Sequence, residues 1–238
     1  MISIQRSSVL LLLFTAACIP RKQPGSSAGA ENTVEGKKCG PDGVIDDGED
    51  NNNQSAATKG RGGYWYTFAD DSSAITPTAG KKGGVFNMSQ GGANGSQYGA
   101  HMNGKVGGGN IVFAGMGLNF TEPKGPYDAS AYKGISFWAK KGSAGTAKVR
   151  LKVPDKNTDP DGKVCAECFN DFGSDLVLTE QWTKYVVPFN QMKQLGGWGS
   201  PHPPAIDPKT IYGVQFQVNE PGASYDIWID DVEFTGCP

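Results

Sequence analysis

Hydrophobic and polar residues alternate with a period of two along most of the chain after residue 45. The clearest run is 147–153, where apolar and basic residues alternate in the sequence AKVRLKV. Such alternation is typical of a strand that has one face in a core and the other in solvent. Similar runs, bounded by Gly, Asn, Asp or Pro, predict strands at 64–69, 84–88, 97–106, 111–120, 134–140, 182–189, 211–218 and 225–234.

No stretch outside the N-terminal leader has an apolar stripe of helical period longer than two turns. Glycine (34 residues) and proline (15) together make up about a fifth of the 238 residues, well above the usual ~12%. They supply the turns that many short strands need, and they exclude a helical bundle. Nine or ten strands within residues 43–238 predict an all-β fold, a two-sheet antiparallel β-sandwich of jelly-roll type.

The N-terminus carries an export signal. Arg6 precedes the apolar run VLLLLF, which is followed by TAA and then Cys18. This run is shorter than the ~20 residues that cross a bilayer as a helix. It resembles the lipobox of bacterial lipoproteins, which implies that residues 1–17 are a signal peptide and that Cys18 carries the lipid. Simple secretion is the alternative. Residues 18–42 are polar and predict a flexible, lipid-anchored linker before the domain at 43–238.

The charge of the chain is nearly balanced. Lys and Arg number 22 against 24 Asp and Glu, for a formal net charge of −2. No basic field is available to bind nucleic acid by counterion release, so this class of partner is excluded. We expect a monomer.

Four cysteines remain after Cys18, and an exported chain reaches a compartment that permits their oxidation. Cys165 and Cys168 are three positions apart and predict a disulfide across a small loop. Cys39 and Cys237 are then predicted to pair from end to end of the domain. The CxxC spacing also suits zinc or redox chemistry, which remains the alternative for Cys165 and Cys168.

The strand at 211–218 offers candidate ligand-binding residues. Val214, Phe216 and Val218 alternate with Gln215 and Gln217, so the two amides project together from the face opposite the core. Amides donate and accept hydrogen bonds without charge, as sugar hydroxyls require. The alternative is an ordinary solvated sheet face.

Aromatic and basic residues complete the candidate ligand site. Trp198 stands in the Gly- and Pro-rich loop LGGWGSPHPP, where its ring binds sugar or caps the core. In YWY at 64–66, Trp65 faces away from both tyrosines, and one side of that strand must be core. We include Trp65 as a candidate, together with Arg150 on the polar face of 147–153.

Acidic residues gather near both ends of the domain, in DDGED at 46–50 and at Asp230 and Asp231. The apolar positions change parity between Ile229 and Val232, which predicts a β-bulge at these two aspartates. Carboxylates brought together from the first and last strands repel each other unless they are neutralised. Structural Ca²⁺ is the usual solution in exported proteins, and a solvated acidic edge is the alternative.

Catalysis has little support in the sequence. Only His101 and His202 are available as histidines, and no Ser, His and Asp set or metalloprotease motif is present. Glycosidases need two carboxylates at a separation that sequence does not give. We assign no catalytic residue, and a glycoside hydrolase stays open as an alternative.

Over residues 44–236 the chain resembles family 11 carbohydrate-binding modules. The matching segments occur in the same order: VIDDGED at 44–50, YDASAYKGISFW at 127–138, WTKYVVPF at 182–189, IYGVQF at 211–216 and IWIDDVEF at 227–234. The resemblance implies a galactose-binding-like jelly roll with a β-glucan ligand on its concave face. It implies Trp198, Tyr212 and Gln215 as ligand-binding residues, and Asp47, Glu49 and Asp230 as calcium ligands.

The loop that contains Cys165 and Cys168 departs from the family pattern, and we expect it on the rim of the groove. Together these observations predict a non-catalytic surface lipoprotein that binds polysaccharide, anchored in the bacterial cell envelope at the outer membrane or cell surface. The alternatives are an envelope module for protein interaction or assembly, and a cellulase-associated glycan hydrolase.

Overall fold

The computed structural model describes residues 39–79 and 86–237. Three one-turn 3-10 helices lie in this part: η1 (Gly40–Gly43), η2 (Pro160–Gly162) and η3 (Phe189–Gln191). The rest of its regular structure is strand: β1 (Val44–Asp46), β2 (Trp65–Ala69), β3 (Ala74–Thr76), β4 (Ser89–Gln90), β5 (Tyr98–Lys105), β6 (Ala114–Asn119), β7 (Gly134–Lys141), β8 (Lys148–Val153), β9 (Phe172–Val177), β10 (Thr183–Pro188), β11 (Gly213–Val218) and β12 (Ser224–Thr235).

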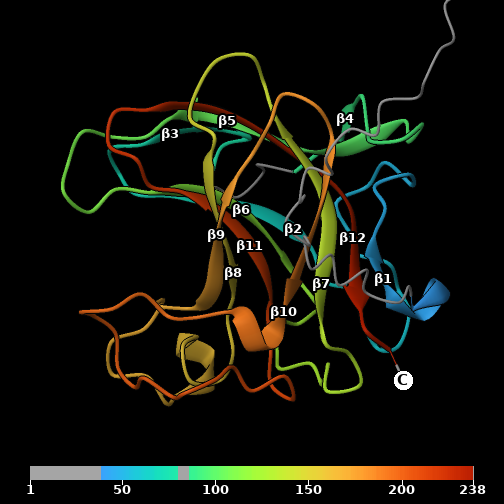
Figure 1. Cartoon of the computed structure of the whole chain (residues 1–238), viewed down its shortest axis with the longest axis vertical. Helices are drawn as coiled ribbons and strands as arrows, with labels where there is room; N and C mark the ends of the chain where they lie inside the picture. The colour runs from blue at the N-terminus through green and yellow to red at the C-terminus, as the bar shows by residue number, and fades with distance from the viewer. Residues whose placement is uncertain (1–38, 80–85, 238) are drawn as a thin grey trace, which may run out of the picture. The chain divides into compact units, whose positions relative to one another are not determined.

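The strands form two antiparallel sheets, which confirms the predicted all-β sandwich (Figure 1). One sheet has seven strands in the order β10-β7-β12-β5-β3, with β1 added to β12 and β4 to β5. The other has five strands in the order β2-β6-β11-β8-β9. Strand β11 therefore lies at the centre of the five-stranded sheet, and its residues occupy the middle of both faces of that sheet.

The period-two pattern explains how the core forms between the sheets. In β11, Val214, Phe216 and Val218 are fully buried, whereas Gln215 and Gln217 turn to the outer face. Each strand contributes alternate side chains in this way, and each large apolar side chain that is fully buried stabilises the fold by about 1.5–3 kcal/mol. The innermost rings are Phe120, Phe137, Phe172, Phe216 and Phe234.

The structure adds strands that the sequence pattern did not predict, namely β1, β3, β4 and β9. Strand β9 has the sequence FGSDLV, in which only Phe172, Leu176 and Val177 are strongly apolar. It forms because β8 pairs with it along its whole length, from Lys148↔Val177 to Val153↔Phe172. The described part of the predicted strand at 84–88 is not a strand.

Both predicted disulfides are present, Cys39–Cys237 and Cys165–Cys168, with Cα–Cα distances of 5.5 and 5.1 Å. Cys39 and the first three residues of helix η1 precede residue 43, where the predicted domain begins. The predicted signal peptide, Cys18 and most of the predicted linker lie outside the described residues. Within the described part, no helix is long and apolar enough to cross a membrane.

Candidate functional site

A groove of about 940 Å³ lies over the outer face of the five-stranded sheet. This volume is near the upper end of the ~300–1,000 Å³ that is usual for small-molecule sites. Its floor comes from the outward residues of β2, β6, β11 and β8, and its sides come from the loops around residues 110–113, 167–171 and 195–198. The alternation that buries one face of each strand thus places the polar face of the same strands in the groove.

Two aromatic rings from β2 form part of the floor. Trp65 and Thr67 face the core, so Tyr66 and Phe68 face the groove. Their register partners on β6 are Gly117 and Gly115, and a Cβ placed on Gly117 would lie 2.6 Å from Tyr66 Cζ. The two glycines therefore leave the space in which the rings of Tyr66 and Phe68 lie across the neighbouring strand.

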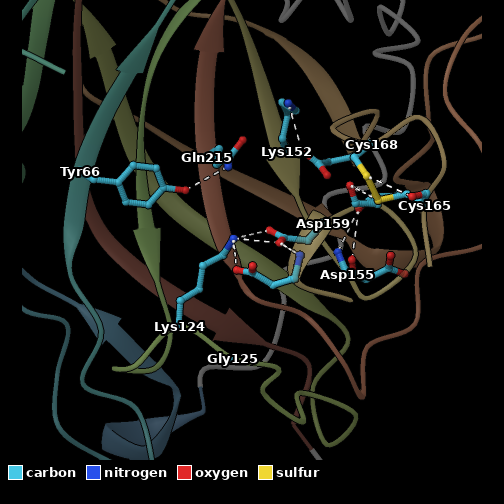
Figure 2. Close-up of polar contacts among 12 residues, drawn as sticks. Tyr66, Lys124, Gly125, Lys152, Asp155, Asp159, Cys165, Cys168 and Gln215 are labelled. Atoms are coloured by element: carbon cyan, nitrogen blue, oxygen red, sulfur yellow. Dashed lines mark hydrogen bonds and ion pairs between the residues drawn. A yellow bond between two sulfur atoms is a disulfide. The ribbon is translucent and has the colours of Figure 1, made fainter. Parts of the chain in front are cut away.

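The two glutamines of β11 present opposite hydrogen-bonding groups to the groove. Gln215 Nε2 donates to the Tyr66 hydroxyl at 3.0 Å (Figure 2), and Gln217 Oε1 accepts from Lys152 Nζ at 3.1 Å. Among the described residues, Gln215 Oε1 remains available as an acceptor and Gln217 Nε2 as a donor. Burial raises the pKa of Tyr66, so its hydroxyl keeps the proton and can donate in turn. The floor therefore offers both donors and acceptors to neutral hydroxyl groups.

Every cation that lines the groove is paired with a carboxylate. Arg150 Nη1 lies 2.9 Å from Asp175 Oδ1, and Lys152 Nζ lies 3.0 Å from Asp171 Oδ2 in a pair that is almost completely buried. Figure 2 shows Lys124 extended toward Asp159, where the two charged groups are 2.7 Å apart. These pairs leave little net field in the groove, which suits an uncharged ligand better than an anionic one.

Trp198 stands on one side of the groove with 39% of its surface exposed. Asn170, which is 2% exposed, holds its loop: Nδ2 donates to the carbonyl oxygens of Leu195 (2.8 Å) and Trp198 (2.6 Å), and Oδ1 accepts from Leu195 N (2.9 Å). Glu167 Oε2 accepts from Gly199 N at 2.8 Å. The backbone that carries the indole is thus held at the groove by a buried amide and by a carboxylate from the loop that contains Glu167.

Four of the six predicted ligand residues line the groove, namely Trp198, Gln215, Gln217 and Arg150. The structure places the other two predicted ligand residues, Trp65 and Tyr212, in the interior instead. Trp65 is 4% exposed, stacks on Phe86, and donates its indole N–H to Asp46 in the interior. Tyr212 is 3% exposed and has the same parity as the core residues of β11. Neither ring can reach a ligand in the groove.

Tyr66 and Phe68 are floor residues that were not among the predicted site residues. The sequence carries two signals for them. The YWY alternation places Tyr66 opposite Trp65, and the Gly-x-Gly spacing of 115 and 117 marks a neighbouring strand without side chains on one face. Glycines in a strand interior often mark a close approach of another group.

The acidic residues lie at the junction of β1, β12 and the segment 91–98. Asp230 Oδ2 accepts from Ala93 N at 2.6 Å, and Glu49 Oε1 accepts from Gln97 N and Tyr98 N at 2.8 and 3.0 Å. Burial, together with repulsion by Asp231 and Glu49, raises the pKa of Asp230 to about 7. The predicted bulge is present, because the pairing of β12 with β7 shifts between Asp230 and Glu233.

The fit of this junction to a metal is partial. Asp47 is exposed, whereas Asp230 is buried. Within residues 39–79 and 86–237, no group of three or more His, Cys, Asp or Glu side chains lies close enough together to hold a metal ion. The set Asp47, Glu49 and Asp230 therefore stays a prediction for calcium.

A β-sandwich with amides and free aromatic rings along a groove on one sheet has the architecture of a carbohydrate-binding module. The chain belongs to the carbohydrate binding domain 30 family, whose model matches residues 75–236. The predicted resemblance is thus confirmed for carbohydrate-binding modules in general, and the family that the match shows is 30 rather than 11. None of the curated proteins compared with the chain matches it.

Several solved structures share the fold. The family 11 module from Clostridium thermocellum in complex with a β-1,3-1,4-mixed-linked tetrasaccharide has 16% identity and a TM-score of 0.51, over 73% of this chain and 89% of that one. The family 30 module of a cellulosomal cellulase of C. thermocellum has 12% identity and a TM-score of 0.50, over 72% and 90%. An exo-β-agarase has 12% identity and a TM-score of 0.51, over 82% and 25%.

Proposed function

We propose that this protein is a non-catalytic surface lipoprotein that binds a neutral, β-glucan-like polysaccharide along the groove of the five-stranded sheet. The observation that carries the proposal is the groove floor, where the Tyr66 hydroxyl, Gln215 Oε1 and Gln217 Nε2 remain available beside aromatic rings. The mixed-linked glucan bound by the family 11 module supports a β-glucan as the first ligand to test. Weak affinity is expected, with a dissociation constant between about 1 mM and 1 μM.

We propose that the protein is not catalytic because each carboxylate that lines the groove is already held by an ion pair or a hydrogen bond. The lining carboxylates are Asp159, Glu167 and Asp171. Asp159 and Asp171 are paired with lysines, and Glu167 accepts a hydrogen bond from Gly199 N. A glycosidase needs one carboxylic acid that donates a proton and a second carboxylate that attacks or activates water. Carboxylates held in these structural bonds are poorly placed for either role.

Affinity electrophoresis tests the proposal. The purified protein is run through native gels that contain mixed-linked β-1,3-1,4-glucan, a soluble cellulose derivative or agarose, and release of reducing ends is followed with the same polysaccharides. Retardation by at least one glucan without release of reducing ends is the expected result. No retardation by any of them would refute polysaccharide binding, and reducing ends that increase with time would refute the non-catalytic assignment.

Lipid anchoring through Cys18 is part of the proposal and is supported by the N-terminal sequence alone. The expected result is incorporation of labelled fatty acid into the wild-type protein in the producing bacterium, with recovery in the membrane fraction. Cys18→Ser should abolish both. A wild-type protein that is released without label would show simple secretion instead.

Structural calcium at Asp47, Glu49 and Asp230 is also proposed, with support from the closeness of Glu49 to the buried Asp230. A bound cation would offset the repulsion between these carboxylates. Addition of Ca²⁺ to protein first treated with EDTA should then raise Tm, and Asp230→Asn should remove that response. An unchanged Tm would exclude a structural role for calcium at this junction.

A further inference from the structure

Phe169 is a large apolar side chain held in water beside the groove. Phe169 is 59% exposed, and it lines the groove directly after Cys168. Its backbone has a φ of +74°, in the left-handed region that bulky residues rarely adopt. Such a conformation persists only where the surrounding structure enforces it.

Both chain neighbours of Phe169 are fixed. On one side, Cys168 is joined to Cys165 by the disulfide that closes the loop, which Figure 2 shows above Asp155 and Asp159. On the other side, the Asn170 side chain is bonded to the loop that carries Trp198. The backbone N–H of Phe169 itself donates to Thr158 O at 2.8 Å. The chain therefore cannot turn this ring inward without breaking several of these contacts.

The ring of Phe169 is also free on its faces. Among the residues that the structure describes, neither Phe169 nor Trp198 stacks on another aromatic ring, in contrast to Trp65, which stacks on Phe86. Aromatic faces that are free and exposed beside a groove are suited to the C–H surface of a sugar ring. The buried Asn170 follows Phe169 in the chain and bonds to the backbone of Leu195 and Trp198, so it ties the two loops together.

We propose that Phe169 is a further ligand-contacting ring of the groove, positioned by the Cys165–Cys168 loop and Asn170 to contact the polysaccharide at the side of the groove that carries Trp198. The proposal rests on the polysaccharide-binding function proposed above. It adds a contact supplied by the disulfide loop, the part of the chain that departs from the family 11 pattern.

Phe169→Gly separates a binding role from a structural one. Glycine adopts a φ of +74° without strain, which offsets the greater freedom that it gives the unfolded chain. We expect Tm to stay within about 3 °C of the wild type. Affinity for mixed-linked β-1,3-1,4-glucan should fall about tenfold, as expected for loss of one stacking ring. Phe169→Asn, which also tolerates this conformation, should behave in the same way, and Phe169→Tyr should retain binding.

Val177→Ala is the matched control, because Val177 is 70% exposed on the edge strand β9 and does not line the groove. Its affinity should equal that of the wild type. If the wild type binds and Trp198→Ala does not, but Phe169→Gly and Phe169→Asn bind as tightly as the wild type, the role of Phe169 is overturned while polysaccharide binding stands. If the wild type is retarded by no polysaccharide, both proposals fail together.

Discussion

Aromatic rings and cations occur on the outer faces of both sheets, but they are arranged in opposite ways. On the seven-stranded sheet, Lys140, Trp228 and His101 lie on the neighbouring strands β7, β12 and β5, and Trp182 directly precedes β10. These four side chains form one row, which we call the indole ladder. Lys140 Nζ lies 4.8 and 4.9 Å from the ring centroids of Trp182 and Trp228, and the His101 ring stacks on Trp228 at 3.9 Å. On the five-stranded sheet, the cations that line the groove are paired with carboxylates, and the Tyr66 and Phe68 rings lie against each other at a tilt.

The number of aromatic residues on a sheet face therefore does not identify a binding face. Three of the five tryptophans, Trp138, Trp182 and Trp228, belong to the outer face of the seven-stranded sheet or its edge, whereas Trp198 is the indole at the groove. In the indole ladder, neighbouring side chains cover the ring faces, so a sugar would have to displace them. The groove differs because Trp198 is exposed without stacking on another ring, and because Gln215 and Gln217 each keep one amide group without a partner among the described residues.

The largest effect is expected when a tryptophan is replaced by alanine on each of the two faces in turn. Trp198→Ala should lower affinity for mixed-linked glucan about thirtyfold, or about 2 kcal/mol, as for a central aromatic contact. Trp228→Ala removes an equally large ring from the indole ladder and should leave affinity unchanged. Isothermal titration calorimetry measures both affinities. Loss of binding in Trp228→Ala would show that the ligand binds the seven-stranded sheet instead of the groove.

Gly117→Ala tests the floor of the groove. The added Cβ would lie 2.6 Å from Tyr66 Cζ and 2.7 Å from the Tyr66 hydroxyl oxygen, so the ring must move and its hydrogen bond to Gln215 is disturbed. We expect a loss of stability of about 1–3 kcal/mol and a fall in affinity of about tenfold. Gly108→Ala is the control, since a Cβ there meets no atom within 4 Å. If Gly117→Ala binds the glucan as tightly as the wild type does, Tyr66 is not part of the ligand site.

Alkaline pH should destabilise the protein through its buried tyrosines. Burial raises the pKa of Tyr66 and of Tyr225, so the folded state favours the protonated hydroxyl more than the unfolded chain does, where the pKa is about 10. This contribution is complete below about pH 10 and is lost as pH rises above it. Thermal melts from pH 7 to pH 11 should show Tm falling from about pH 10, and Tyr66→Phe should reduce the fall. A flat profile up to pH 11 would contradict the assignment.

The smallest effect is expected in the indole ladder. Lys140→Met keeps most of the side-chain volume but removes the cation between Trp182 and Trp228. Loss of a cation–π contact costs about 0.5–1 kcal/mol at a partly exposed position, which lowers Tm by about 2 °C. Glucan affinity should not change. A higher Tm in Lys140→Met would show that the ammonium does not stabilise this row.

Strand alternation was sufficient to predict the sandwich and to place Gln215 and Gln217 on an outer face. The same alternation assigns Tyr212 to the core, and only the family resemblance made it a ligand candidate. Strand β9 could not be predicted, because its Gly, Ser and Asp residues have low strand propensity and pairing with β8 decides its conformation.

The loop part of the site depends on contacts that the sequence does not display. Trp198 was a candidate because a large ring in a Gly- and Pro-rich loop must pack or bind, but its position at the groove comes from Asn170, 28 positions away along the chain. Phe169 follows a disulfide cysteine and gives no periodic signal. Its exposure results from a left-handed backbone conformation, which only the folded structure reveals.

The bond between Cys39 and Cys237 turns the intervening chain, with a sequence separation of 198, into a closed covalent circle. In the chain-entropy view, closing a circle of this size stabilises the fold by about 5 kcal/mol. A protease that cuts any one loop inside the circle opens it without releasing a fragment, so the two sheets stay attached to each other. The protein thus survives a single cut as one molecule.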